Sequence, residues 1–109
     1  SIVFEDFIDF VTNIHSKLPK TKIIYISIKP SPNRWSFWEK MSQTNILIYK
    51  YTMEHSYLYY ADTATSMLND KGFPKSLFFI SDSLHLSKEG YRNWDNVLLT
   101  VMNEALGLD

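Results

Sequence analysis

An acidic residue and a histidine stand three positions apart near the end of the chain, in the segment Asp82-Ser83-Leu84-His85. In a turn, a carboxylate at this spacing can reach the imidazole, fix its tautomer and stabilise the imidazolium that forms when the ring takes a proton. A base of this kind needs a hydroxyl within hydrogen-bond reach to activate. The alternative is a turn capped by Asp82 with His85 as a surface loop residue, and the four residues alone favour it.

The other two histidines offer less chemistry. His15 falls near the end of a predicted helix, where we expect a structural role, and His55 falls in a polar connection, where we expect it to be solvated. Neither has a second histidine at ligand spacing, so no metal site is expected. The chain has no Cys and only three Gly, which excludes disulfides, thiolate metal sites and a glycine-rich phosphate loop.

Helices and strands are predicted to alternate around the Asp82–His85 segment. We predict helices over 2–18, over 35–51 and from about 88 onward, with strands over 22–28 and 58–61 and a helical turn over 63–69. A long loop over 70–86 precedes the last helix, whose predicted N-cap is Ser87 and whose predicted stop is Gly107. Long loops of this kind are often functional.

Apolar side chains recur at helical spacing and define the faces that should be buried. In the first helix these residues are Phe4, Phe7, Ile8, Val11, Ile14 and Leu18. In the last helix they are Tyr91, Trp94, Val97, Leu98, Val101 and Ala105. The apolar run at positions 77–80 is expected to pack beneath the Asp82–His85 turn.

The alternation predicts an α/β fold with parallel strands and helices on both faces of the sheet. Two strands are few for such a sheet, and a lone parallel pair leaves strand edges open. We therefore interpret residues 1–109 as a single, partial domain whose first strands are missing. Self-association through the exposed strand edge is a further expectation.

Composition narrows the classes of partner. With 109 residues, 45% hydrophobic and 16% aromatic, the chain can build one core, and its net charge of −1 offers no footprint for nucleic acid. No apolar run is long enough to span a bilayer, and the start shows no signal-peptide pattern. The absence of Cys slightly favours the cytoplasm but leaves the compartment undetermined.

The stretch from Phe78 to Trp94, FFISDSLHLSKEGYRNW, resembles the last conserved block of the SGNH (GDSL-type) lipases and acylhydrolases. The matching positions are Phe78, Asp82, Leu84, His85, Leu86, Gly90, Tyr91 and Trp94. Upstream, residues 23–35 (IIYISIKPSPNRW) are similar to the family's fourth strand and the loop after it, and Tyr60-Ala61-Asp62 resembles the strand that follows. The resemblance thus covers nearly the whole chain.

The resemblance implies a three-layer α/β/α flavodoxin-like sandwich that hydrolyses carboxylic esters with a Ser-His-Asp triad and no cofactor. Asp82 and His85 would be the acid and the base, and Pro30, Arg34 and Trp35 would border the substrate pocket. The family's Gly-Asp-Ser nucleophile and its oxyanion donors lie earlier in the sequence and are not matched. The chain alone is therefore expected to be nearly inactive, and its substrate is expected to be a lipid, an acetylated sugar or a small ester.

Two segments imitate the unmatched motifs. Ser81-Asp82-Ser83-Leu84 looks like Gly-Asp-Ser-Leu, but a strained nucleophile elbow is not expected at Ser83, two residues before His85. Asn69-Asp70 looks like the end of Gly-x-Asn-Asp, yet a turn before Gly72 is the favoured interpretation.

Two other functions stay open. The first is a non-catalytic carbohydrate-binding module that uses Trp35, Trp38 and the tyrosines, although packing of these tryptophans is the favoured interpretation. The second is an assembly module that complements a separate N-terminal half.

Overall fold

The structure is a computed structural model that describes residues 2–108. Its helices and strands follow one another as α1 (Ile2–Lys17), β1 (Ile23–Ile26), α2 (Trp38–Met53), β2 (Leu58–Ala61) and α3 (Lys88–Leu106). Short 3₁₀ turns lie at Trp35–Phe37, Thr65–Met67 and Ser76–Phe78. Every predicted helix and strand is present, and the predicted turn at 63–69 is the second of these 3₁₀ turns.

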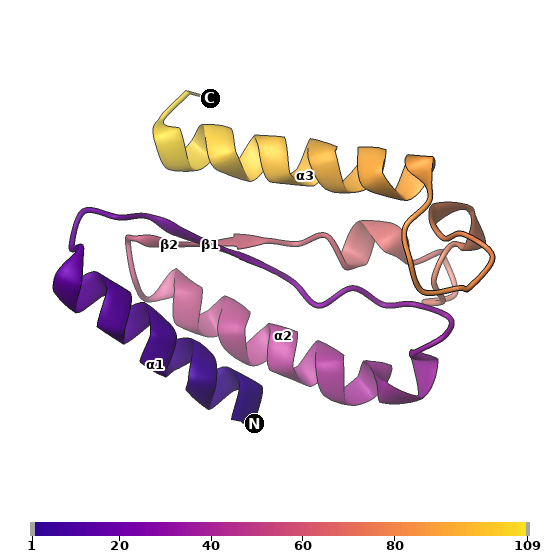
Figure 1. Ribbon diagram of the computed structural model, residues 1–109, viewed down its shortest axis with the longest axis horizontal. Helices are drawn as coiled ribbons and strands as arrows, with labels where there is room; N and C mark the ends of the chain where they lie inside the picture. The colour runs from indigo at the N-terminus through magenta and orange to yellow at the C-terminus, as the bar shows by residue number, and fades with distance from the viewer. Residues whose placement is uncertain (1, 109) are drawn as a thin grey trace.

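β1 and β2 form a parallel pair in which Ile23 lies opposite Leu58 and Ile26 lies opposite Ala61. α3 covers one face of the pair, while α1 and α2 cover the other (Figure 1). The arrangement confirms the predicted α/β fold with parallel strands between helical layers. It also brings the loops that follow β1 and β2 to the same end of the sheet, where binding sites of parallel α/β folds lie.

β1 is shorter than its predicted range because, at its end, a side chain takes the backbone hydrogen bonds that a neighbouring strand would otherwise make. The side-chain amide of Asn45, a buried residue of α2, accepts a hydrogen bond from the backbone N–H of Ile28 (2.9 Å) and donates one to the Ile28 carbonyl (3.0 Å). Asn45 Oδ1 also accepts a hydrogen bond from the Tyr25 hydroxyl (3.0 Å). Ser27 still donates its N–H to the Ala61 carbonyl of β2 at 3.0 Å, and the next residue, Ile28, is held by α2 instead.

The predicted helix faces are right except near their ends. Val11 of α1 and Ala105 of α3 are buried, as expected. Leu18 is exposed because α1 ends at Lys17, one residue earlier. Tyr91 is also exposed, because the neighbouring Gly90 is the residue that points into the protein at that end of α3.

Both predicted ends of α3 are confirmed. The Ser87 hydroxyl accepts a hydrogen bond from the Gly90 N–H at 3.1 Å, which satisfies one of the free N–H groups of the first turn. Gly107 has φ of 72°, the left-handed conformation that commonly ends a helix.

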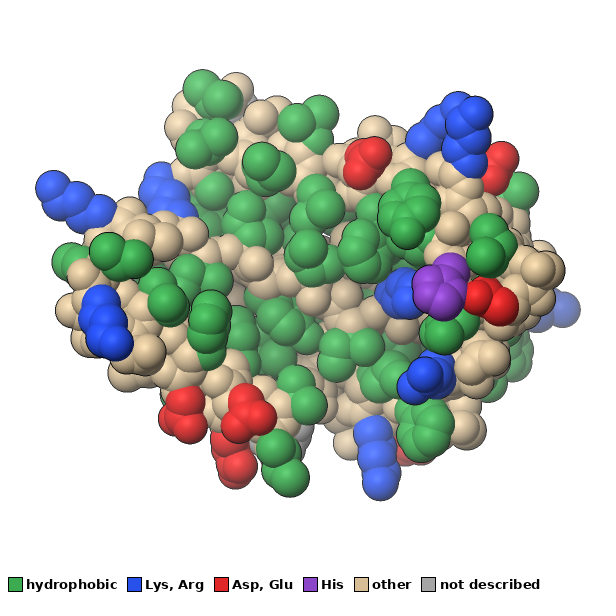
Figure 2. Space-filling view, viewed as in Figure 1, with side chains coloured by type: hydrophobic (Ala, Val, Ile, Leu, Met, Phe, Trp, Pro, Cys, Tyr) green, Lys and Arg blue, Asp and Glu red, His purple; other side chains and the backbone are tan. Residues whose placement is uncertain are grey.

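The outer edge of β1 is open, because the sheet of the described residues has only the strand order β1–β2. β1 lies in front of β2 in Figure 1, so that view faces this edge. In the same view, hydrophobic side chains gather along the middle of the surface, between α3 and the helices of the opposite layer (Figure 2). No helix among residues 2–108 is long and apolar enough to cross a membrane.

Candidate active site

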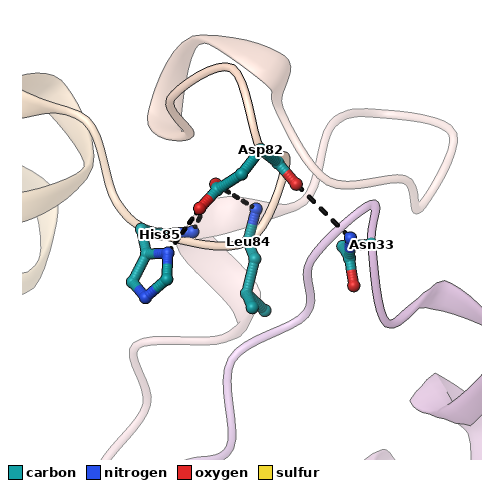
Figure 3. Close-up of polar contacts among 4 residues, drawn as sticks. All are labelled: Asn33, Asp82, Leu84 and His85. Carbon is teal, nitrogen blue, oxygen red and sulfur yellow. Dashed lines mark hydrogen bonds and ion pairs between the residues drawn. The ribbon is translucent and has the colours of Figure 1, made fainter.

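The Asp82 carboxylate holds its own turn and the imidazole of His85 at the same time. Its Oδ1 atom accepts hydrogen bonds from the backbone N–H groups of Leu84 and His85, both at 2.9 Å. Its Oδ2 atom lies 2.5 Å from His85 Nδ1 (Figure 3). The first two bonds fix where the carboxylate stands, and the third fixes the orientation of the ring.

These bonds determine the charge of the pair. The hydrogen bond to the His85 ring, followed by the bonds from the His85 and Leu84 N–H groups, lowers the pKa of Asp82 to about 2. A carboxylate that is ionised in this way keeps the proton of a neutral imidazole on Nδ1, which leaves Nε2 free to accept another. Nε2 lies on the side of the ring that points away from Asp82 (Figure 3).

The pair sits at the tip of a tight loop. Phe79 and Leu86 form an antiparallel bridge at its base, and the Ile80 N–H donates to the His85 carbonyl at 2.9 Å. Ser83 N–H also donates to the Ile80 carbonyl at 2.9 Å. This closure holds Ser83 at φ of 58°, in the left-handed region that few residues other than glycine adopt; that Ser83 is not a nucleophile stays a prediction.

A small apolar core lies beneath this loop. Met67, Phe79 and Leu86 are buried together, and Phe78 and Trp94 pack against them. Phe78 and Phe79 therefore confirm the predicted packing beneath the turn, whereas Leu77 and Ile80, which flank this pair, are exposed. The loop is thus anchored by two consecutive phenylalanines, and its polar tip is left accessible.

Gly90 allows the loop to lie against the start of α3. A Cβ atom at this position would come within 2.3 Å of the Phe78 carbonyl oxygen. That distance is far below any acceptable contact, so only glycine fits. Close packing against Phe78 therefore explains why the matched motif has glycine at position 90, before Tyr91.

The loop after β1 reaches the same site through Asn33. Its backbone N–H donates to the Ser83 carbonyl at 3.0 Å, and its side-chain Nδ2 donates to the Asp82 carbonyl at 3.4 Å (Figure 3). Sequence reasoning identified the Pro-Ser-Pro-Asn segment as a turn but missed this contact. No local pattern could have found it, because the two loops lie 49 residues apart in sequence.

The three predicted substrate-binding residues occupy different surroundings. Arg34 is exposed and borders a hollow of about 390 Å³ that Leu84 also lines. Trp35 is half-buried and lies on another surface, where its ring packs near Trp38 and Phe73. Pro30 is fully buried, so its side chain packs inside the protein and does not support a role as a substrate contact.

The pair itself is open to solvent, since the side chains of His85 and Asp82 are 70% and 42% exposed. No hydroxyl among residues 2–108 hydrogen-bonds to His85 Nε2, and the one hydrogen bond of the ring within this range goes to Asp82. The described residues therefore hold an acid and a base without the hydroxyl that the base would activate.

Asn69 forms the expected turn. Its side-chain oxygen accepts hydrogen bonds from the N–H groups of Lys71 (2.9 Å) and Phe73 (3.1 Å).

The other histidines lie away from this site. His15 stacks on Tyr57 with ring centroids 3.8 Å apart. His55 Nδ1 donates to the Tyr51 carbonyl at 2.9 Å and the ring stacks on Tyr51, so the prediction of a solvated side chain is wrong. Both rings pack among aromatic residues, and no cluster of three or more metal-ligating side chains occurs in the described part of the chain.

Comparison with known proteins gives structural matches only. No family profile and no curated protein matches this sequence. Among solved structures, the esterase domain of the ORF1 protein from the zebrafish ZfL2-1 retrotransposon matches with a TM-score of 0.79 and 18% identity, over 94% of this chain and 58% of that chain. A protein from Streptococcus pneumonia described as a platelet activating factor matches with a TM-score of 0.76 and 19% identity, over 89% of this chain and 49% of that one.

The chain has an esterase-like fold. The two likenesses confirm the predicted fold class and its resemblance to esterase structures, at identities that establish the fold alone. This chain also spans only about half the length of the structures it matches, 58% and 49%.

Proposed function

We propose that this chain supplies the base and the orienting acid of a serine ester hydrolase, and that the nucleophilic serine comes from polypeptide outside these 109 residues. His85 Nε2 takes the proton of the serine hydroxyl as the serine attacks the acyl carbon, and gives it to the alcohol that leaves as the ester C–O bond breaks. It then takes a proton from the water that hydrolyses the acyl-serine and releases the carboxylic acid. Asp82 orients the ring and stabilises the imidazolium in both steps. The 2.5 Å contact between Asp82 Oδ2 and His85 Nδ1 is the observation that carries the proposal.

The position of the pair supports this role. It lies where the loops after the parallel strands meet, and Asn33 ties the loop after β1 to the Asp82 and Ser83 carbonyls. A serine delivered to that end of the sheet would reach the exposed Nε2 side of His85 without displacing any protein contact of the ring. The likeness to an esterase domain supports the same chemistry.

The surface of the chain supports the arrival of further polypeptide. The molecule exposes 7310 Å², whereas a monomer of its 12.8 kDa typically exposes roughly 6300 Å². The excess agrees with the open edge of β1 and the apolar band beside it (Figure 2). A strand that paired with this edge would bury that band and could carry the serine to His85.

The test joins the chain to a segment that bears the Gly-Asp-Ser and Gly-x-Asn-Asp motifs of SGNH hydrolases, and measures hydrolysis of p-nitrophenyl acetate. We expect activity with the joined protein and almost none with the chain alone. His85→Gln should lower kcat by roughly 10³-fold or more, because a triad loses most of its rate with its base.

His55→Gln is the matched control, since it removes an imidazole that packs on Tyr51 and should leave kcat unchanged. An active joined protein in which His85→Gln retained full kcat would contradict the proposal. Full esterase activity of the 109-residue chain alone would contradict the assignment of the serine to outside polypeptide.

A further inference from the structure

A second hollow, of about 410 Å³, lies between α2 and the end of β2. Trp38 and Tyr49 of α2 and Tyr60 and Asp62 at the end of β2 define what we call the aromatic pocket. None of its lining residues belongs to β1 or to the Asp82–His85 loop. A strand paired with the free edge of β1 would therefore leave it open, and its volume suits a small molecule.

The rings of the aromatic pocket are held in place by one another. Tyr49 and Tyr60 meet edge to face, with centroids 5.2 Å apart and planes at 82°. Trp38 stacks against Trp35, with centroids 6.2 Å apart and planes at 14°. Each ring thus has an aromatic partner that orients it before a ligand arrives.

The charge of the aromatic pocket is negative. Asp62 is exposed, and its carboxylate accepts hydrogen bonds from the N–H (3.1 Å) and the hydroxyl (2.7 Å) of Thr65, which fix its position. No Lys, Arg or His is among the described residues that line the pocket. Burial, and then the charge of Asp62, raise the pKa of Tyr60, so the phenol stays neutral beside the carboxylate.

The polar side chains that line the aromatic pocket, apart from its two tyrosines, are already bonded within the protein. The Ser42 hydroxyl donates to the Glu39 carbonyl at 2.9 Å, and the Asn45 amide is engaged with Ile28. The Thr65 hydroxyl donates to Asp62. A sugar, which requires several free hydrogen-bond partners, would find few here. A quaternary ammonium group requires none, because it is held by π faces and by negative charge.

We propose that the aromatic pocket binds a quaternary ammonium group of the choline type. The cation lies against the rings of Tyr49 and Tyr60, Asp62 balances its charge, and Trp38 lines the far end of the same hollow. This binding is independent of ester hydrolysis, because neither Asp82 nor His85 takes part in it.

The test titrates the intact chain with choline chloride and, in parallel, with 3,3-dimethylbutan-1-ol, the neutral molecule of the same shape. Isothermal calorimetry and NMR shifts of the tryptophan indole N–H groups report binding. Choline should bind at least about tenfold more tightly, a difference of roughly 1.4 kcal/mol. Equal affinity for the two molecules, no choline binding, or glucose binding as tight as choline would overturn the proposal.

Variants separate charge from ring shape. Asp62→Asn, which keeps the turn at Thr65, and Tyr49→Leu should each weaken choline binding by about fivefold or more, whereas Tyr49→Phe keeps the ring and should stay within about twofold. Asp95→Asn on α3 is the control for an exposed carboxylate elsewhere and should change nothing. Unchanged choline affinity in both Asp62→Asn and Tyr49→Leu, with thermal unfolding unaltered, would also overturn the assignment.

A choline-type group can come from a free metabolite or from a lipid headgroup. Co-sedimentation with phosphatidylcholine vesicles that free choline reverses, and that phosphatidylglycerol vesicles do not reproduce, would identify the lipid source. Choline binding without co-sedimentation would identify a soluble ligand. Both outcomes support the site, and neither depends on whether His85 is catalytic.

Discussion

The chemistry of this chain is concentrated on one carboxylate. One carboxylate oxygen of Asp82 accepts the two backbone hydrogen bonds of the turn, and the other accepts the hydrogen bond of the His85 ring. The position and the charge of Asp82 therefore depend on the same bonds. Because all these donors stabilise the ionised form, they act in the same direction on its pKa. The residue can therefore orient a base without competing for its proton.

The titration of Asp82 should report this arrangement. Its pKa of about 2 lies below the ordinary 3.8, so the folded protein favours the ionised carboxylate. The stabilisation it provides is complete above about pH 4 and is lost as the pH falls through about 2. Carbon-13 NMR of the carboxyl group should show a midpoint near 2 that rises in His85→Ala and stays unchanged in His55→Ala. An unchanged midpoint in His85→Ala would contradict the contact.

Ser83 is tested separately because its positive φ is a backbone strain that some nucleophilic serines also have. Its hydroxyl is not hydrogen-bonded to His85, so nothing activates it. We expect a fluorophosphonate probe to leave the 109-residue chain unlabelled by intact mass. A stoichiometric adduct that Ser83→Ala abolished would show that the chain carries its own nucleophile.

At the scale of elements, the site depends on how closely α3 approaches the loop before it. Ser87 caps the helix and also donates through its hydroxyl to the Leu77 carbonyl at 2.6 Å, while its N–H donates to the Phe78 carbonyl at 2.8 Å. The start of α3 and the base of the Asp82–His85 loop are thus one hydrogen-bonded unit. A change that separates them should disturb the catalytic pair.

Gly90→Ala should separate them. The added Cβ would meet the Phe78 carbonyl at 2.3 Å, and because that atom belongs to the backbone, the loop has to shift. We expect the free energy of unfolding in urea to fall by roughly 1–3 kcal/mol, the range for overpacked sites. The signal of the His85 Nδ1 proton should weaken or move as well.

Gly107→Ala is the control for this change. Its Cβ would meet nothing within 4 Å, and only the left-handed backbone opposes it, so roughly 1–2 kcal/mol should be lost without any change at His85. Equal effects of both substitutions on the His85 proton would refute the role assigned to Gly90.

The whole molecule is less closed than a domain of its length usually is. Its radius of gyration is 14.9 Å, whereas about 13 Å is typical of a compact domain of this length. The open edge of β1 offers unpaired backbone groups beside apolar side chains. Without the polypeptide that we propose to cover it, this edge should pair with another copy of the chain.

Ile26→Lys tests that association. Ile26 is an exposed residue of β1, and a lysine there places a charge on the edge that would have to pair. We expect the unaltered chain to sediment as a dimer or larger species at high concentration, and Ile26→Lys to shift it toward the monomer. Met53→Lys, at an exposed position of α2 near β2, should not. A monomer at every concentration for the unaltered chain would contradict the prediction.

Much of this protein follows from the sequence because the relevant signals are local. Helical spacing of apolar residues located all three long helices, and the cap at Ser87 and the stop at Gly107 set both ends of α3. The three-residue spacing of Asp82 and His85 made their contact possible, although the resemblance was needed to favour it over a surface loop. Each of these features is decided within one or two turns of the chain, so neighbouring residues suffice to predict it.

The tertiary structure decided the features that join distant segments. Asn45 ends β1 by hydrogen-bonding to Ile28, and Asn33 joins the loop after β1 to Asp82 and Ser83. Gly90 faces the protein interior, so the side chain of Tyr91 faces the solvent. The aromatic pocket likewise exists only because α2 lies beside the end of β2. Such contacts depend on how the elements pack in space, and no periodicity or local spacing in the sequence records that packing.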